Sequence, residues 1–201
     1  MRTGNSLVPN TAMAADAGVL AILRAQHAEI GDLLAQVAES SGVARQQSFD
    51  VLREQLALHE STEQLVLRFA SRTLAPEGVA SARNGEERHI ADLLARLEKL
   101  DVDSAAFTQG LGRLGATVVK HMELEETEEF PAAEDGLSAD EQAALGRRIA
   151  RVIELAPTRP HPAIFADATV AQWTVGPYAA LRDRAAALVA AVPAVPEQPE
   201  E

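Results

Sequence analysis

Two short segments each carry a histidine and a glutamate four residues apart. His59 and Glu63 stand in "HESTE", and His121 and Glu125 stand in "HMELE". Residues i and i+4 of a helix lie on one face, one turn apart, so each segment presents an imidazole and a carboxylate together. Both groups bind transition metals. Each segment is therefore a candidate for half of a metal site.

Two further histidines extend this pattern into a repeat. His27 precedes His59 by the same interval that separates His89 from His121. The arrangement H…HxxxE thus occurs twice, with identical internal spacing. One HxxxE pair is weak evidence in so acidic a chain, and a single histidine on an apolar helix face is more often a packed core residue. The equal separations carry the prediction.

Hydrophobic periodicity predicts the helices that position these residues. Pro131 is expected to bend or end the fourth helix. The short connections predict an all-α fold, an antiparallel up-down four-helix bundle with additional C-terminal helices. The expected helices cover residues 12–39, 43–73, 76–100, 104–133, 138–155 and 178–192.

The helix lengths bring the histidines to a similar height in the bundle. The first helix continues about 13 residues from His27 to its turn, and the second returns about 15 residues to His59. At about 1.5 Å per residue, these two imidazoles arrive side by side. His89 and His121 meet in the same way if a longer turn or a frayed helix start absorbs a mismatch in the second hairpin. We therefore expect four imidazoles and two carboxylates to converge at the bundle axis.

This donor set over-supplies a single metal ion, especially zinc, which prefers four ligands in a tetrahedron. Two ions about 3.5–4 Å apart can share the two carboxylates, with two histidines on each ion. A nitrogen-rich, carboxylate-bridged pair favours iron. The alternative, an ordinary core, would bury six polar groups unpaired at a cost of several kcal/mol.

At these residues the sequence resembles the hemerythrin-like, HHE cation-binding family. The resemblance covers roughly residues 15–135 and ends with Phe130 and Pro131. It implies a bundle that holds two iron ions as a non-haem, oxo- or hydroxo-bridged centre. Glu60 matches an extra carboxylate ligand of some relatives. The ligands that the resemblance implies are His27, His59, His89 and His121 as terminal groups and Glu63 and Glu125 as bridges.

One departure from the family pattern bears on function. Oxygen-transport hemerythrins carry HxxxH on the third helix, whereas Leu93 follows His89 here. This departure favours sensing, peroxide or nitric-oxide chemistry, or iron handling over simple oxygen carriage. The leading hypothesis is a di-iron protein that binds O2 or reacts with H2O2 or NO, with catalase-like or peroxidase-like turnover as its enzymatic form. The alternative is an iron- or redox-sensing binding module without turnover. Ferritin-type storage is disfavoured, because only Glu86 to His89 fits its ExxH motif.

The other acidic residues near these motifs are expected to have little part in metal binding. Glu86 could substitute as a ligand, although a solvated surface acid is the preferred interpretation. The run Glu123, Glu126, Glu128 and Glu129 is interpreted mainly as a solvated face, with attraction of iron as the minor reading.

Composition limits the remaining function classes. The net charge of −12 argues against nucleic-acid partners and anionic membranes, and the lack of cysteine excludes disulfides and thiolate sites. No apolar run suits a signal peptide or membrane span, so a cytoplasmic protein is expected. The predicted organisation is a bundle over residues 12–135, a helical extension over 136–192 and a disordered tail over 193–201. The extension is expected to pack on the bundle or on the second subunit of a homodimer.

Overall fold

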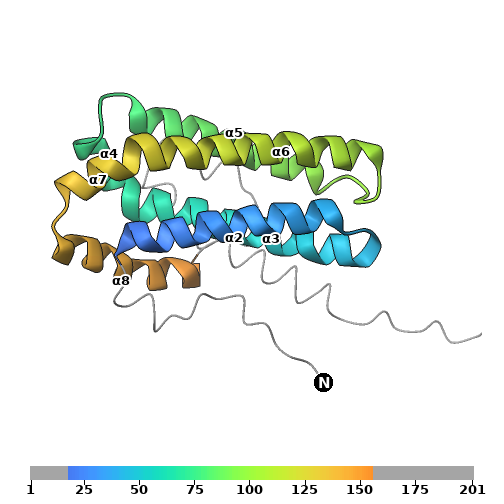
Figure 1. The fold of residues 1–201 in the computed structure, drawn as a ribbon, viewed down its shortest axis with the longest axis horizontal. Helices are drawn as coiled ribbons and strands as arrows, with labels where there is room; N and C mark the ends of the chain where they lie inside the picture. Colours follow the sequence, from blue (N-terminus) through green and yellow to red (C-terminus); the bar gives the residue numbers. More distant parts are fainter. Residues whose placement is uncertain (1–17, 156–201) are drawn as a thin grey trace, which may run out of the picture.

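The computed structural model describes residues 18–155, and this part of the chain forms helices without any β-strand (Figure 1). Two π-helical turns, η1 (Glu63–Leu67) and η2 (Glu125–Glu129), interrupt the long helices. The prediction of an all-α fold is confirmed. The predicted helix 178–192 and the tail lie outside the described residues. The α-helices are α2 (Val19–Glu39), α3 (Gly42–Thr62), α4 (Arg68–Leu74), α5 (Val79–Leu97), α6 (Ala105–Leu124), α7 (Phe130–Gly136) and α8 (Ala139–Leu155).

Two antiparallel hairpins build the bundle. Helices α2 and α3 form one hairpin and α5 and α6 form the other, and in Figure 1 the second lies above the first. Turn η1 leads α3 into α4, and η2 leads α6 into α7, so that α4 and α7 pack together at one end. Helix α8 follows and packs on α2 and α3. This confirms the predicted up-down four-helix bundle with a further helix after it.

Polar contacts join the two hairpin turns at the opposite end of the bundle. Gly42 has a φ of 56°, and its N–H donates to Oδ1 of Asp103 at 2.9 Å. The buried guanidinium of Arg45 donates to the carbonyl oxygens of Val37 at 3.1 Å and Val102 at 3.0 Å. A positive φ is accessible to glycine without steric cost, which suits Gly42 to this turn. These bonds fix the register of the hairpins.

The apolar core consists of two clusters with a polar layer between them. The first cluster fills the end near the hairpin turns, and Phe49 and Phe107 meet there edge to face, with ring centroids 5.0 Å apart. The second cluster fills the end covered by α8. Its buried members are Val19, Leu20, Ile22, Leu23, Val66, Leu67, Phe130, Ala133 and Ile149. The predicted metal-binding residues lie on the helices between these clusters.

Helix α8 begins with a capping box, a local pattern that the segment "SADE" (Ser138 to Glu141) contains. The carboxylate of Glu141 accepts from the N–H and the hydroxyl of Ser138, at 2.9 and 2.7 Å. The buried side chain of Ile149 joins the second apolar cluster. Within residues 18–155 the structure contains no helix with the length and apolar character needed to cross a membrane.

Of the two outcomes expected at Pro131, a bend or an end of the helix, the structure excludes the end. The helix does not end there, because α7 continues to Gly136. Pro131 stands in the first turn of α7, directly after η2. A proline in the first turn of a helix costs little, because its missing N–H is not needed for an intrahelical bond.

Candidate metal centre

Both HxxxE segments run into a π-helical turn at the glutamate. The carbonyl oxygen of Glu63 accepts from the N–H of Arg68, and that of Glu125 accepts from the N–H of Phe130. These i→i+5 bonds define the wider turn, which is rare and often found at functional sites. Each bond begins at the glutamate of its HxxxE motif, so the two turns recur with the same spacing as the motifs. The internal repeat therefore extends to the backbone.

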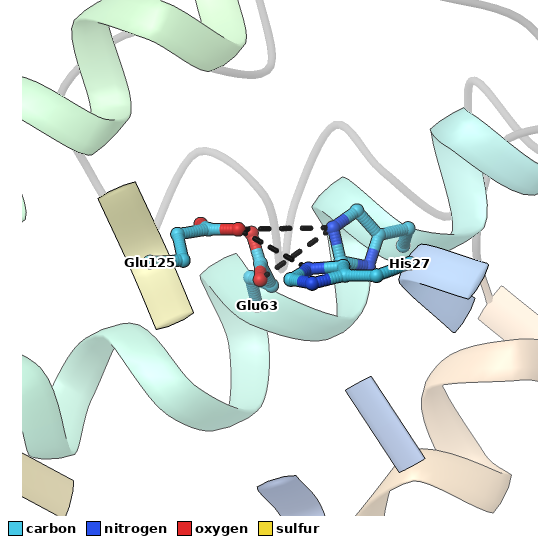
Figure 2. A group of neighbouring side chains, drawn as sticks. His27, Glu63 and Glu125 are labelled. Atoms are coloured by element: carbon cyan, nitrogen blue, oxygen red, sulfur yellow. Dashed lines mark ion pairs between the residues drawn. The ribbon is translucent and has the colours of Figure 1, made fainter. Parts of the chain in front are cut away.

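Five of the predicted ligands converge between the two apolar clusters, and all five are buried. Figure 2 shows three of them, His27, Glu63 and Glu125, side by side. Nε2 of His27 lies 3.4 Å from Oε2 of Glu125, and Nε2 of His121 lies 3.2 Å from Oε1 of the same carboxylate. Nε2 of His59 lies 3.6 Å from Oε1 of Glu63. Residues from α2, α3 and α6 thus meet at one level, as the helix lengths predicted.

A polar side chain fixes the outer nitrogen of each of these three histidines. The partner is a carboxylate or amide oxygen, which only accepts, so each Nδ1 carries the proton and donates it. Each Nε2 then points into the centre, and such partners orient metal-binding imidazoles in other proteins. The Nδ1 contacts are His27 to Glu126 at 2.7 Å, His59 to Gln26 at 3.2 Å and His121 to Glu86 at 2.9 Å.

Ring packing holds two of the imidazoles in place. Phe130 is fully buried and stacks on His27, with centroids 5.5 Å apart and planes 17° apart. The rings of His27 and His59 meet edge to face at 4.8 Å. The rotamers of both histidines are therefore restricted before any ligand binds.

Within residues 18–155, the inward-facing atoms of the centre have no hydrogen-bond partner. They are Nε2 of His27, His59 and His121 and both carboxylate oxygens of Glu60, Glu63 and Glu125. Buried acceptors without donors are strongly unfavourable. Cations placed among these lone pairs would satisfy the whole set, and imidazole and carboxylate are ligands that iron accepts. The residues present therefore fit the metal pair that the sequence predicts.

His89 does not join this centre. Its side chain is exposed on α5, whereas Glu87, Ile90 and Leu94 form the buried face of that helix. Since each residue advances a helix by about 100°, His89 lies roughly 200° from Glu87. The expectation that a histidine of the third helix would face the bundle axis is therefore wrong for this structure.

Carboxylates stand where the fourth imidazole was expected. Glu60, which the sequence suggested only as an extra ligand, is buried, and so is Glu87, which the sequence reasoning did not single out. In each of two groups, the candidate ligand atoms lie within 4.8 Å of one another. The first group is His27, His59, Glu63 and Glu125, and the second is Glu60, Glu63, Glu87 and His121.

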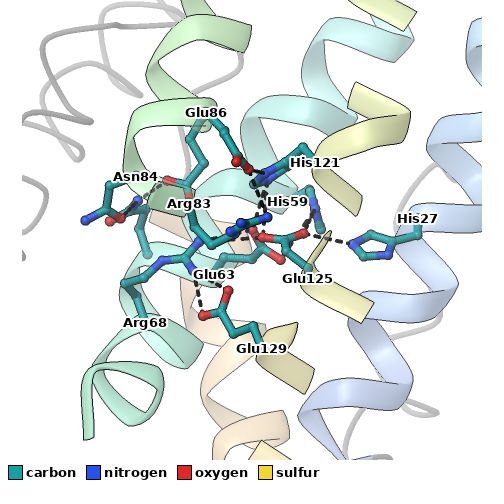
Figure 3. A network of polar contacts seen from close by, with 12 residues as sticks. His27, His59, Glu63, Arg68, Arg83, Asn84, Glu86, His121, Glu125 and Glu129 are labelled. Atoms are coloured by element: carbon teal, nitrogen blue, oxygen red, sulfur yellow. Dashed lines mark hydrogen bonds and ion pairs between the residues drawn. The ribbon is translucent and has the colours of Figure 1, made fainter. Parts of the chain in front are cut away.

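A buried arginine lies beside the carboxylates (Figure 3). The guanidinium of Arg68 donates to the carboxylates of Glu87 and Glu129. Its Nη2 is also 3.6 Å from Oε2 of Glu63 and 3.6 Å from Oε1 of Glu125. Arg68 therefore supplies a fixed positive charge next to both shared acids.

Sequence reasoning missed Arg68 because of the π-helical turn. In a regular α-helix, a residue five positions after Glu63 points about 140° away from it. The i→i+5 bond at η1 brings Arg68 back toward the glutamate. No sequence signal marks that wider turn.

The acidic run of the fourth helix is only partly a solvated face. Glu129 is fully buried, so the solvated interpretation is wrong for it. Its position four residues after Glu125 was a signal for the same helix face. The carboxylate of Glu126 accepts a hydrogen bond from Nδ1 of His27, and Glu128 pairs with Arg83 at 3.3 Å. Glu86 likewise contacts His121 rather than standing free as a surface acid.

Burial is the largest single cause of the pKa shifts in the centre, although neighbouring groups outweigh it at two residues. The pKa of His121 is raised by Glu125 and Glu63, and the pKa of Glu63 is lowered by His59 and His121. Burial lowers the pKa of His59 to about 3, which leaves this imidazole neutral near pH 7 and available to a metal. Burial raises the pKa of Glu60 well above its ordinary range and that of Glu87 to about 7. The raised pKa values of Glu60 and Glu87 have the same cause, because a buried carboxylate ionises readily only where positive charge lies beside it.

Comparison with known proteins agrees with this geometry. Residues 18–133 match the hemerythrin HHE cation binding domain, and the chain belongs to this family. A crystal structure of a hemerythrin HHE cation binding domain-containing protein from Mycobacterium kansasii superposes with a TM-score of 0.63 at 20% identity, and the match covers 83% of this chain and 99% of that one. Among curated proteins the comparison finds no significant match. The structural likeness supports the fold, and the family supports cation binding.

Proposed function

We propose that the chain holds two metal ions between its helices, with iron as the redox-active metal, and that this centre binds O2 or reacts with H2O2 or NO. The observation that carries the proposal is the set of inward lone pairs without partners. Three imidazole nitrogens and three carboxylates share this property. The predicted ligands His27, His59, Glu63, His121 and Glu125 belong to this set, and Glu60 completes it.

The buried charge supports two ions rather than one. Five glutamates of the centre are buried, and Arg68 is the buried cation that contacts four of them. Full ionisation of the five acids beside Arg68 leaves a net charge of −4, which two divalent cations neutralise. Uncompensated buried charge is strongly unfavourable, so metal ions would replace the protons that these acids otherwise retain. The five acids are Glu60, Glu63, Glu87, Glu125 and Glu129.

The protein environment suits a redox-active centre that small molecules reach. Leu56, Val66 and Val118 are buried in the apolar clusters on either side, where they exclude water. A surface hollow of about 320 Å³ between α2 and α6 is lined by His27 and Met122, among others, and offers a route for a diatomic ligand. An iron pair supplies electrons and open coordination positions for such molecules.

Metal analysis of protein purified without oxygen tests the proposal. We expect about two metal ions per chain and a change in the optical spectrum when air is admitted. Iron-dependent peroxide consumption that is lost in His121→Ala would establish turnover. The control is Lys120→Ala, because Lys120 is the exposed residue next to His121 on α6 and its ammonium group pairs with Glu123 at 3.8 Å. Protein that binds no metal with an intact fold would contradict the proposal.

A second candidate is an iron- or redox-sensing module without turnover. The observation that favours it is the packing of α8 against η1, the turn that begins at the shared ligand Glu63. A metal that orders η1 would then alter the packing of α8. Hydrogen exchange of α8 amides, measured with and without metal, tests this function. Equal exchange in both states would contradict it.

A further inference from the structure

The two halves of the centre differ, although the hairpins that build them repeat. When the two HxxxE motifs are aligned, His27 corresponds to His89, which is exposed, and Glu60 corresponds to Met122, which is buried. Arg68 corresponds to Phe130, so one half has a guanidinium where the other has the ring that stacks on His27. The α5–α6 hairpin therefore lacks an inward imidazole, and the α2–α3 hairpin supplies the extra carboxylate of Glu60, which lies near Glu87 and His121.

The two candidate positions therefore offer different donor atoms. The first position has two imidazoles, from His27 and His59, and two carboxylates. The second position has the imidazole of His121 and three carboxylates. Nitrogen-rich sites suit iron, copper and zinc, whereas oxygen-rich sites suit manganese and magnesium.

Glu60 is the strongest feature of the second position. Its side chain is 3% exposed, and neither of its carboxylate oxygens has a hydrogen-bond partner. Glu87, by contrast, accepts from Gln64 at one oxygen and from Arg68 at the other. Among the described residues, Glu60 is thus a buried carboxylate without a hydrogen bond, and its candidate ligand atom lies within 4.8 Å of that of His121.

We propose that the position formed by Glu60, Glu63, Glu87 and His121 takes a hard divalent cation, manganese, while the His27 and His59 position takes iron. This inference rests on the proposed two-metal centre and adds the identity of the second ion. Divalent iron binds most ligand sets more tightly than manganese does. Oxygen donors reduce that advantage, so manganese competes best at the second position.

A competition experiment on the full-length chain tests the inference without any substitution. Metal-free protein is offered Fe²⁺ and Mn²⁺ together, in equal excess and without oxygen, and unbound metal is then removed. We expect about one ion of each metal per chain, with the bound manganese visible in the electron paramagnetic resonance spectrum. Two irons per chain would overturn this inference and leave the proposed function intact. Binding of neither metal would overturn both.

Variants assign the manganese to its position. Glu60→His restores an imidazole, and we expect the bound manganese-to-iron ratio to fall about tenfold. Met122→Leu, at the corresponding buried position of the other half, should keep the ratio of the unmodified protein. Should Glu60→His not fold, Glu60→Gln is the isosteric replacement. It should lose manganese and retain iron, and an unchanged ratio would overturn the inference.

Discussion

Nε2 of His121 lies 3.2 Å from Oε1 of Glu125, across the junction where α6 passes into η2. His59 and Glu63 make the same contact at 3.6 Å where α3 passes into η1. One local unit, a histidine followed one turn later by a glutamate and a π-helical turn, is therefore used twice. The acids of these units lie close to three inward-facing histidines, so their removal should affect the whole centre.

Metal should stabilise the fold through these acids. Binding to the native state alone adds about 2.7 kcal/mol to the free energy of unfolding at a metal concentration of 100 Kd. We expect Glu125→Ala to abolish most of this gain, because the carboxylate of Glu125 lies within 4.0 Å of Nε2 of each of the three inward-facing histidines. Thermal unfolding with and without Fe²⁺, under anaerobic conditions, measures the effect. An equal metal-induced gain in the variant would contradict the assignment of Glu125 as a ligand.

The acids that hold the outer nitrogens should tune metal affinity without binding metal. Glu126→Ala frees Nδ1 of His27, and Glu86→Ala frees Nδ1 of His121. Each change should weaken metal binding by about 10- to 100-fold. Anaerobic titration with Fe²⁺ gives the dissociation constants. The matched control is Glu123→Ala, which removes a carboxylate from the same helix region without touching a histidine; an equally large loss there would argue for a general charge effect.

Arg68 should be essential for the stability of the metal-free protein. Arg68→Met leaves the buried carboxylates of Glu87 and Glu129 without their cation, and we expect a loss of about 3–5 kcal/mol in the free energy of unfolding. Urea unfolding measures the loss. Adding Glu129→Met to this variant should recover part of the stability, because an apolar pair can replace a buried ion pair. If the two losses were simply additive, the pairing would have no energetic role.

The cap of α8 provides a pH-dependent contribution that is independent of the centre. The side-chain and backbone hydrogen bonds from Ser138 lower the pKa of Glu141 below its ordinary value of 4.5. A lowered pKa in the folded state means that the contribution is present above pH 4.5 and is lost as the pH falls through the lowered pKa. The stability difference between the unmodified protein and Glu141→Gln should therefore shrink in acid. Carboxyl NMR titration of Glu141 checks the pKa directly, and an ordinary value would refute the cap.

Local sequence signals predicted the helical bundle and most of the centre. Hydrophobic periodicity marked the helices. The repeated H…HxxxE spacing placed five of the six expected ligands together, because the spacing of residues along a rigid helix sets the height and the direction of their side chains. The capping box at Ser138 is equally local. These features depend on residues within one helix or on the lengths of two neighbouring helices.

Tertiary structure decided which groups complete the centre. His89 and Glu87 are two residues apart on one helix, and only packing against the other helices determines that Glu87 is buried and His89 exposed. Arg68 reaches the acids because η1 departs from regular helical phase, which no residue spacing reveals. The sequence alone thus determined that imidazoles and carboxylates would meet inside a helical bundle. The rotation of α5 and the two π-helical turns decided that three histidines, several carboxylates and one guanidinium lie together in the candidate centre.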